Sequence, residues 1–531
     1  MKMKISRTPL AAALTLLMSG CMVGPDYHRP PVQVPATYKE LPGWTQAEPA
    51  ATAPKGDWWT GFNDPLLNEL EPQVVISNQT VRQDYANYEE ALAEVRVARA
   101  SLFPTIGVTG SATRARSSTG SLSSSNANFG NFQRINNSGS LEGSLNWDLD
   151  VWGEVRRTIE ENAATAEASE ATLANATLSE QIALATAVID LRVSDANIDL
   201  LTQTVAAYQH FLSVVSDQDK AGTIAPSDVI TARTQLETAQ ANLINLGVAR
   251  AKYAHAIAVL VGKNPEDLDI PHSTTMPSLP SIPVGVPSTI LERRPDIATA
   301  ERQMAAQNAA IGVAVAAYYP TISLSALDGF TQSPLSGLLH AANYVWSLGG
   351  SASETIFDGG ARSGQVAAAK AAYDAAVANY RGTVLGAFQN VEDDLSGLRI
   401  LAEQADALQR AVTDATRGTE IAFNEYQAGT VDYTTVATAQ TTQLSNQQTA
   451  LNVQEERLVD AANLIGDLGG GWSASSLHDA RHPERAARAA SDAAASGAAV
   501  ASAVPTAAAS DANAASAGNA GSASPSQPVT P

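Results

Sequence analysis

The residue most open to chemistry is the single cysteine of the chain, Cys21. It follows three cations within the first seven residues, a short apolar run over 10–18 and two small residues. A charged start, a brief apolar core and a small-residue cleavage site make a secretory signal that is too short to span a membrane. We therefore predict a signal peptide over 1–20, whose removal leaves the thiol of Cys21 at the new amino terminus.

The residues around this thiol indicate what happens to it. Met18-Ser19-Gly20-Cys21 resembles the processing box of bacterial lipoproteins, with methionine where leucine is more usual. The resemblance implies that Cys21 is lipidated and anchors the chain to a membrane. No free thiol then remains, so a disulfide framework is excluded even in an oxidising compartment.

No other set of residues indicates catalysis. The chain contains no nucleophile elbow, phosphate loop or paired-cysteine motif, and no two histidines have the spacing of a helical metal pair. The charged run 293–296 is better interpreted as the start of a helix that closes a linker than as a catalytic group. The sequence therefore predicts no enzyme, no metal site and no cofactor. The seven histidines lie at positions 28, 210, 255, 272, 340, 478 and 482.

Composition narrows the possible partners of this 531-residue chain. The formal charge is −21, and loss of the three signal cations takes it to −24. Such acidity argues against nucleic acid, whose phosphates require basic patches. After the signal no apolar run approaches the ~20 residues of a helical span, so any membrane crossing beyond the lipid must use β-strands.

The two ends of the chain differ from its middle. Prolines at seven positions between 25 and 54 indicate an extended strap over 21–65 rather than a domain. From 473 to 531 the chain is mostly Ala, Ser, Pro and Gly, and such a tail cannot bury enough surface to fold. We predict that the tail is disordered.

The middle of the chain contains two copies of one unit. Leu102-Phe103-Pro104-Thr105-Ile106 recurs as Tyr318-Tyr319-Pro320-Thr321-Ile322, and Ala221-Gly222-Thr223 recurs as Ala428-Gly429-Thr430. A longer Ser/Asn/Gly-rich loop near 116–138 accounts for the different offsets of the two matches. We therefore predict a first helix-hairpin-helix repeat over 66–262, a linker over 263–286 and a second repeat over 287–472.

Each copy contains a pair of predicted strands. From Leu141 to Leu149 apolar residues occupy the odd positions and polar residues the even ones, a period-two pattern typical of transmembrane barrel strands. A soluble sheet with one wet face is the alternative, which the secretory signal and the repetition disfavour. Four strands cannot close a barrel alone, because known barrels start at about eight, so the chain must oligomerise. The expected strands are at about 105–115, 139–150, 321–330 and 343–357.

Long helices surround the strand pairs. A helix over 66–103 precedes the first pair, and proline-free, Ala-rich helices over 157–219 and 361–426 would each extend on the order of 95–100 Å. Gly222 and Gly429 break these helices, and shorter helices return over 224–261 and 431–467. An entering and a returning helix stacked end to end would have about the length of one long helix. This arrangement predicts a tall helical cylinder beneath the strands.

With these features the chain resembles a TolC-like outer-membrane factor, in the lipoprotein branch typified by OprM and NodT. The resemblance covers roughly 21–472, and it implies an α+β membrane protein with an internal two-fold repeat. It also implies a homotrimer whose twelve-stranded outer-membrane β-barrel, with four strands per chain, continues into a periplasmic α-helical barrel. The motifs are CMVGPDYHRP from Cys21, WWTGFNDPL from Trp58, RRPDI from Arg293, IFDGG from Ile356 and GGGW ending at Trp472.

The resemblance further implies a function. The chain would be the outer-membrane channel subunit of a tripartite, RND-type multidrug efflux pump, with a periplasmic adaptor and an inner-membrane pump as partners. Two alternatives remain: a conduit for type I protein secretion, and a poreless periplasmic coiled-coil lipoprotein, which has no need of the strands. Neither the transported substrates nor the identities of adaptor and pump follow from the sequence, since the pump selects the substrate. Acidic faces inside a closed barrel would give a weak cation preference.

In this family the helix–helix turns form the periplasmic end, where the adaptor binds. The corresponding turns here are Gly222-Thr223 and Gly429-Thr430. Both glycines also fit the simpler role of a helix terminator with positive φ.

The family's latch pairs a tyrosine three residues before one glycine with an aspartate six residues after the other. Tyr426 and Asp228 match those positions, so the resemblance implies a hydrogen bond between them that holds the tip closed. The alternative for Asp228 is a dipole-satisfying residue at a helix start. Thr435 and Thr438 stand where relatives often carry lumenal acids, and Val431 replaces a basic residue, so a second, ionic latch does not follow.

Overall fold

The computed structural model describes residues 22–40, 57–116, 135–282, 284, 287, 290–333 and 335–478. Three predicted features lie wholly or largely outside these residues. They are Cys21 with the signal peptide before it, most of the loop near 116–138, and the tail beyond His478.

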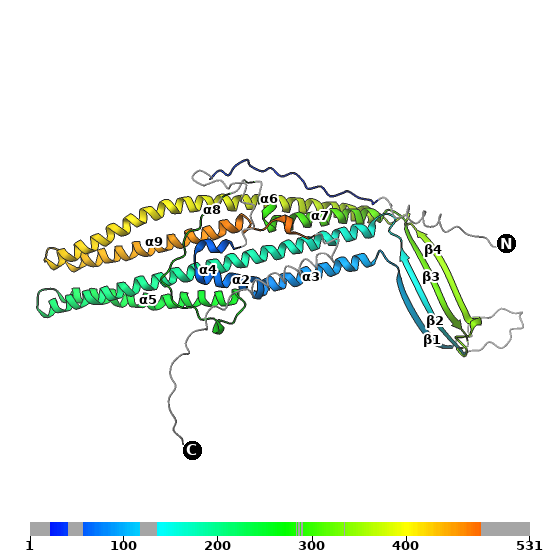
Figure 1. Ribbon diagram of the computed structural model, residues 1–531, viewed down its shortest axis with the longest axis horizontal. Coiled ribbons are helices and arrows are strands. Elements are labelled where there is room, and N and C mark those ends of the chain that lie inside the picture. Colours follow the sequence, from blue (N-terminus) through cyan, green and yellow to red (C-terminus); the bar gives the residue numbers. More distant parts are fainter. Residues whose placement is uncertain are drawn as a thin grey trace, which may run out of the picture. The chain divides into compact units, whose positions relative to one another are not determined.

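The chain forms two series of elements in the same order (Figure 1). In the first, α2 (Pro65–Ser77) and α3 (Gln79–Ala100) lead to β1 (Thr105–Arg116) and β2 (Ile135–Asp148), followed by α4 (Glu154–Lys220) and α5 (Pro226–Leu260). In the second, α6 (Ile290–Arg293) and α7 (Pro295–Ala316) lead to β3 (Thr321–Gln332) and β4 (Tyr344–Ser353), followed by α8 (Ala361–Gln427) and α9 (Tyr433–Asp467). Both α4 and α8 have 67 residues, and both α5 and α9 have 35.

The four strands form one antiparallel sheet in the order β1-β2-β3-β4. The register aligns Ile106, Leu145, Ala326 and Leu348 across one face, on which the odd-numbered apolar residues of β2 also lie. Serines and threonines dominate the other face, where Ser111 and Ser140 form a hydroxyl–hydroxyl bond of 2.9 Å and Ser323 and Ser351 one of 2.7 Å. The sheet is therefore two-faced, as the alternation predicts.

The helices next to the sheet repeat its order. The helix α3 packs on α4, α4 on α7, and α7 on α8, and these four helices connect directly to β1, β2, β3 and β4. At the far ends of α4 and α8 the chain turns into α5 and α9, which pack back along them (Figure 1). A single layer of strands thus continues into a single layer of helices.

The predicted helix over 66–103 is wrong in one respect, because it is two helices that meet at Asn78. Asn78 is extended (φ −62°, ψ 133°), and its side-chain oxygen accepts hydrogen bonds from the amides of Thr80 and Val81, which begins α3. Its side-chain nitrogen donates to the carbonyl of Leu260, 2.9 Å away, at the end of α5. The break therefore lies where the returning helix α5 meets the entering helices.

The second series has the same kind of junction. Arg294, just before α7, donates from Nη1 to the carbonyl of Asp467, 3.0 Å away, at the end of α9. The same guanidinium pairs with the carboxylates of Asp467 and Asp296, at 2.6 and 2.7 Å. The charged run 293–296 is thus a helix junction, with Pro295 as the first residue of α7.

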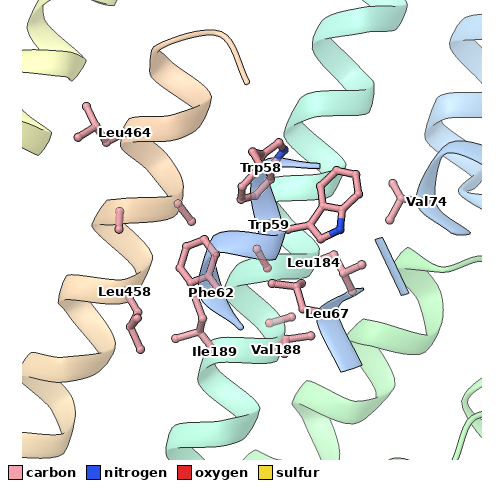
Figure 2. Close-up of a cluster of buried hydrophobic side chains, with 14 of the residues drawn as sticks. Trp58, Trp59, Phe62, Leu67, Val74, Leu184, Val188, Ile189, Leu458 and Leu464 are labelled. Carbon is pink, nitrogen blue, oxygen red and sulfur yellow. The ribbon is translucent and has the colours of Figure 1, made fainter. Parts of the chain in front are cut away.

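The hydrophobic core lies around the middle of α4 (Figure 2). A short 3-10 helix, η2 (Trp58–Phe62), places its aromatic side chains between α4 and α9. Trp58 contacts Trp59 and Phe62 edge to face, and Phe62 is fully buried. Part of the predicted 21–65 strap is therefore a core element, because its aromatic residues fill the space between helices of the two series.

The rest of the described strap, residues 22–40, crosses the helix layer. Its Asp26 pairs with Arg157, a guanidinium that is only 1% exposed and that also donates to two carbonyls of the strap. Three side-chain bonds mark its course over α4, α7 and α8: Arg157 Nη2 to Asp26 Oδ1 at 2.9 Å, Tyr27 Oη to Glu301 Oε1 at 2.6 Å, and Arg29 Nε to Tyr380 Oη at 2.9 Å.

The start of the predicted tail is also held to the helices. The 3-10 helix η6 (Ala474–Ser476) is followed by His478, whose Nδ1 lies 2.5 Å from a carboxylate oxygen of Glu170 on α4. Order therefore extends at least to His478, beyond the predicted boundary at 473. Among the described helices, none is long and apolar enough to cross a membrane.

Candidate functional site

The two hairpin tips have the same backbone geometry. Gly222 and Gly429 adopt φ of 69° and 73°, the left-handed conformation that favours glycine. The amides of Thr223 and Thr430 donate to carbonyls five residues earlier, which closes each long helix in a Schellman motif. Each threonine hydroxyl donates to the same carbonyl, at 2.9 Å in both tips. All four predicted tip residues are therefore at the turns, with the glycines as helix terminators.

The returning helices start differently. Pro226 is the first residue of α5, and Asp228 lies in its first turn, where a negative charge is favourable. In the other tip Asp432 caps α9, accepting hydrogen bonds from the amide and the hydroxyl of Thr435 at 3.1 and 3.0 Å. Asp432 and Thr435 thus have a local role in starting a helix.

Tyr426 connects one tip to the other. Its hydroxyl donates to Oε1 of Gln218 on α4, 2.6 Å away. Burial, and then the negative charge of Asp228, raise the pKa of Tyr426. A phenol has one hydrogen to donate. In the described chain Gln218 is the acceptor, and the Tyr426–Asp228 latch stays a prediction.

A second tyrosine makes a parallel contact. The hydroxyl of Tyr433 on α9 donates to Oε1 of Gln235 on α5 at 3.1 Å, and Gln235 donates back to the carbonyl of Ala437 at 3.1 Å. The rings of Tyr426 and Tyr433 meet edge to face, 5.8 Å apart. The two tyrosines belong to one small apolar cluster, which also contains Val215, Ala232, Ala422, Val436 and Ala437.

Sequence reasoning missed Gln218, Gln235 and Tyr433. Tyr433 is aromatic in a chain with few aromatics, which is a usable signal. The glutamines carry no such signal, because their role depends on how far each helix is rotated toward its neighbour. The tips therefore contain two uncharged tyrosine–glutamine bonds, and the tyrosine–aspartate bond remains a prediction.

Behind the tips lies a hollow of about 430 Å³ between α4, α5 and α9. Tyr208 of α4, Ile230 and Gln235 of α5 and Leu444 of α9 are among its lining residues. Threonine and asparagine side chains supply most of its other polar groups. Within the described ranges no three His, Cys, Asp or Glu side chains are grouped to hold a metal ion.

Comparison with known proteins identifies the family. Residues 72–263 and 286–470 match the family described as outer membrane efflux protein. The chain is 32% identical over 486 residues to the solvent efflux pump outer membrane protein SrpC of Pseudomonas putida, covering 89% of this chain and all of that protein. It is 30% identical over 477 residues to the probable efflux pump outer membrane protein TtgC of the same species, covering 88% and 96%.

A solved structure shares the fold. The outer-membrane channel OprN superposes with a TM-score of 0.78 and 28% sequence identity, covering 85% of this chain and all of that one. The resemblance drawn from the sequence motifs is thus confirmed. The chain belongs to the outer membrane efflux protein family and is an outer-membrane channel of the kind that serves tripartite efflux pumps.

Proposed function

We propose that three copies of this chain form a closed twelve-stranded barrel that continues into a periplasmic helical barrel, the passive exit duct of an RND-type pump. The observation that carries the proposal is the single layer of four strands and four helices in matching order. Among the described strands, β1 and β4 each have a neighbour on one side only, so a membrane-embedded sheet must pair them with other chains. The equal lengths of α4 and α8, and of α5 and α9, support the predicted internal repeat.

The outer helices of the layer support the same assembly. Among the described helices, α3 and α8 stand at the two ends of the order α3-α4-α7-α8, as β1 and β4 stand at the two edges of the sheet. Tyr85 and Val97 on α3 are 48% and 63% exposed, and Leu385 and Ile400 on α8 are 64% and 53% exposed. These apolar side chains are available for contact with a neighbouring chain.

Lipid anchoring at Cys21 fits the course of the strap. Val23 donates its amide to the carbonyl of Trp152, between β2 and α4, at 3.1 Å. Trp152 also stacks on Tyr319, just before β3, with ring centroids 4.9 Å apart. Val23, two residues after Cys21, therefore lies where strands give way to helices, beside aromatic residues suited to a membrane interface.

The hairpin tips would be the periplasmic entrance. Binding of a periplasmic adaptor at Gly222-Thr223 and Gly429-Thr430 would separate α8 and α9 from α4 and α5. That movement breaks the bonds of Tyr426 and Tyr433, each worth about 0.5–1.5 kcal/mol net, which is within reach of a protein contact. The inner-membrane pump would supply the energy.

A gene deletion in the host, complemented by plasmid, tests the function. Wild type should lower intracellular accumulation of a dye such as ethidium, and so should a chain truncated after His478, because the bond to Glu170 is kept. A truncation after Trp472 removes that bond and is the matched comparison. If the deletion strain lost a secreted protein while its dye accumulation stayed unchanged, the result would favour type I secretion. No effect on either would favour the poreless lipoprotein.

A further inference from the structure

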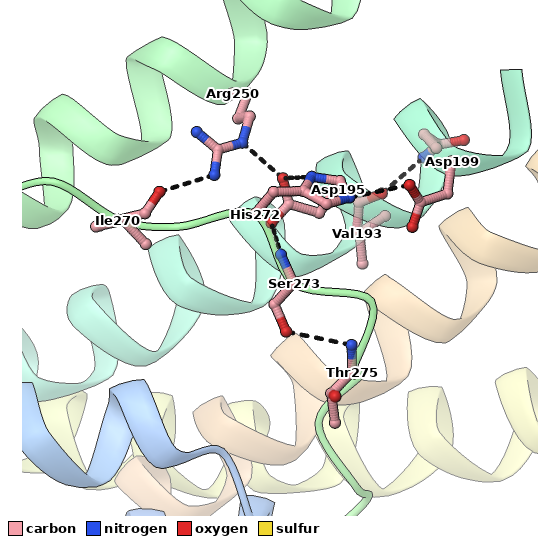
Figure 3. Close-up of polar contacts among 9 residues, drawn as sticks. Val193, Asp195, Asp199, Arg250, Ile270, His272, Ser273 and Thr275 are labelled. Carbon is pink, nitrogen blue, oxygen red and sulfur yellow. Dashed lines mark hydrogen bonds and ion pairs between the residues drawn. The ribbon is translucent and has the colours of Figure 1, made fainter. Parts of the chain in front are cut away.

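The segment between the two series is fastened to the helices by a histidine held between two carboxylates (Figure 3). His272 lies in this connector, residues 263–282, and its ring is bracketed by Asp195 and Asp199 of α4. Nδ1 lies 3.0 Å from Oδ1 of Asp195, and Nε2 lies 2.9 Å from Oδ1 of Asp199. The two aspartates are four residues apart, so they lie on the same face of the helix.

Asp195 is the centre of the cluster. It is fully buried, and its Oδ1 also accepts a hydrogen bond of 2.6 Å from Nε of Arg250 on α5. Its Oδ2 accepts the backbone amide of Ser273 at 3.1 Å. Arg250 in turn donates to the carbonyl of Ile270 at 2.9 Å. Residues 270–273 of the connector are thus bonded to both α4 and α5.

The geometry specifies the charge on the ring. A neutral imidazole has one N–H donor and one acceptor nitrogen, whereas both nitrogens here face carboxylate oxygens that can only accept. Only the imidazolium satisfies both contacts. We propose that His272 is a proton-dependent clamp, which binds the connector to α4 when protonated and releases Asp195 or Asp199 when it loses the proton.

The surrounding charges are consistent with an imidazolium. Asp195 and Asp199 on α4 and Arg250 on α5 are in the bonded cluster, which is neutral overall when His272 is charged. A cavity of about 580 Å³ adjoins it, lined by Asp199, by Asp406 of α8 and by Arg457 of α9. Asp199 already belongs to the cluster, and the charges of Asp406 and Arg457 cancel each other.

Release of the clamp would change this cavity. Thr274 and Leu279 of the connector form part of its wall, opposite α8 and α9. The second ring contact is a hydrogen bond only while the imidazole carries both protons, so this bond is lost when the ring becomes neutral. The connector would then be tightly attached in acid and looser in alkali. This proposal does not depend on transport.

Hydrogen–deuterium exchange of the full-length purified protein, at about pH 5.5 and about pH 8.5, tests the clamp on either side of the ordinary imidazole titration. Rates are corrected for chemical exchange and compared over the connector and over α4. In the wild type, protection of the connector should fall by about tenfold at the higher pH, because a charge-assisted bond is lost. Protection that is the same at both pH values would overturn the proposal.

Asp199→Asn is the matched variant. Its side-chain amide can donate to Nε2 of a neutral ring, so both contacts survive without a second proton. Connector protection should then be independent of pH. An equal fall in wild type and variant would assign the effect to other groups and would also overturn the proposal. His272→Arg, charged at both pH values, should likewise abolish the pH dependence, and protection of α4 reports whether either variant is folded.

Discussion

At the scale of single residues, Glu71 on α2 is a buried acid whose carboxyl group makes no hydrogen bond within the described chain. It is fully buried, and neither carboxyl oxygen has a hydrogen-bond partner in the described residues. Burial raises the pKa of Glu71 to about 9, so the side chain is neutral at physiological pH. A neutral buried acid is tolerated, whereas an unpaired buried charge is not.

The raised pKa has a defined consequence for stability. Below the ordinary glutamate range, near 4.5, both folded and unfolded chains hold this proton, and the contribution is fully present. As pH rises toward about 9, Glu71 ionises in the unfolded chain but not in the folded one, and its contribution to the free energy of unfolding is lost. Glu71→Gln cannot ionise, so its free energy of unfolding relative to wild type should increase between these pH values, by an amount on the order of a few kcal/mol. A constant difference across the range would show that Glu71 is not buried as described.

At the scale of elements, each hairpin depends on a glycine for its backbone conformation and not for space. A Cβ added at Gly222 or Gly429 would meet nothing within 4 Å, yet both have positive φ. The two glycines therefore end their helices through backbone conformation alone, independently of the packing between the tips.

This separation gives a clean mutational comparison. Gly222→Ala and Gly429→Ala should each destabilise the fold by about 1–2 kcal/mol, the cost of a left-handed conformation for alanine. Gly247 is inside α5, where an added Cβ also meets nothing, so Gly247→Ala should be neutral or stabilising by up to about 1 kcal/mol. Thermal midpoints measure all three. If Gly222→Ala and Gly247→Ala behaved alike, the tip geometry described above would be wrong.

The strand edges give a second comparison among elements. Cysteine at Thr109 on β1, combined with cysteine at Ser347, Gly349 or Ser351 on β4, should form disulfides between chains in at least one combination. Cysteines at Thr109 and Glu142 are register partners within one sheet and should cross-link within the chain. Non-reducing electrophoresis should show covalent trimers for the first set, in a Cys21→Ser background, and monomers for the second. Only monomers in every combination would contradict closure through these edges.

At the scale of the whole molecule, sequence and structure agree where the determinants are local. The Ala-rich runs predict α4 and α8 to within a few residues, because proline-free stretches ended by Gly222 and Gly429 leave little choice of boundary. The family motifs identify the fold. The break at Asn78 has a local part that was overlooked, the side-chain cap of α3, and a distant part that could not be predicted, the contact with the carbonyl of Leu260. Gln218 as the acceptor of Tyr426 was missed for the same reason, since it depends on how α4 is rotated toward α8.

The most direct test of the account is planar-bilayer conductance of the purified protein, wild type beside Tyr426→Phe, Gln218→Met and Asp228→Ala. Small, mostly closed channels are expected from the wild type. Tyr426→Phe and Gln218→Met should both raise the open probability by about tenfold, since each removes the same bond in every chain. A larger increase in open probability for Asp228→Ala would favour the tyrosine–aspartate latch over the tyrosine–glutamine bond. No conductance from any of the four, in preparations shown to be folded and trimeric, would contradict the claim that this chain forms a gated channel.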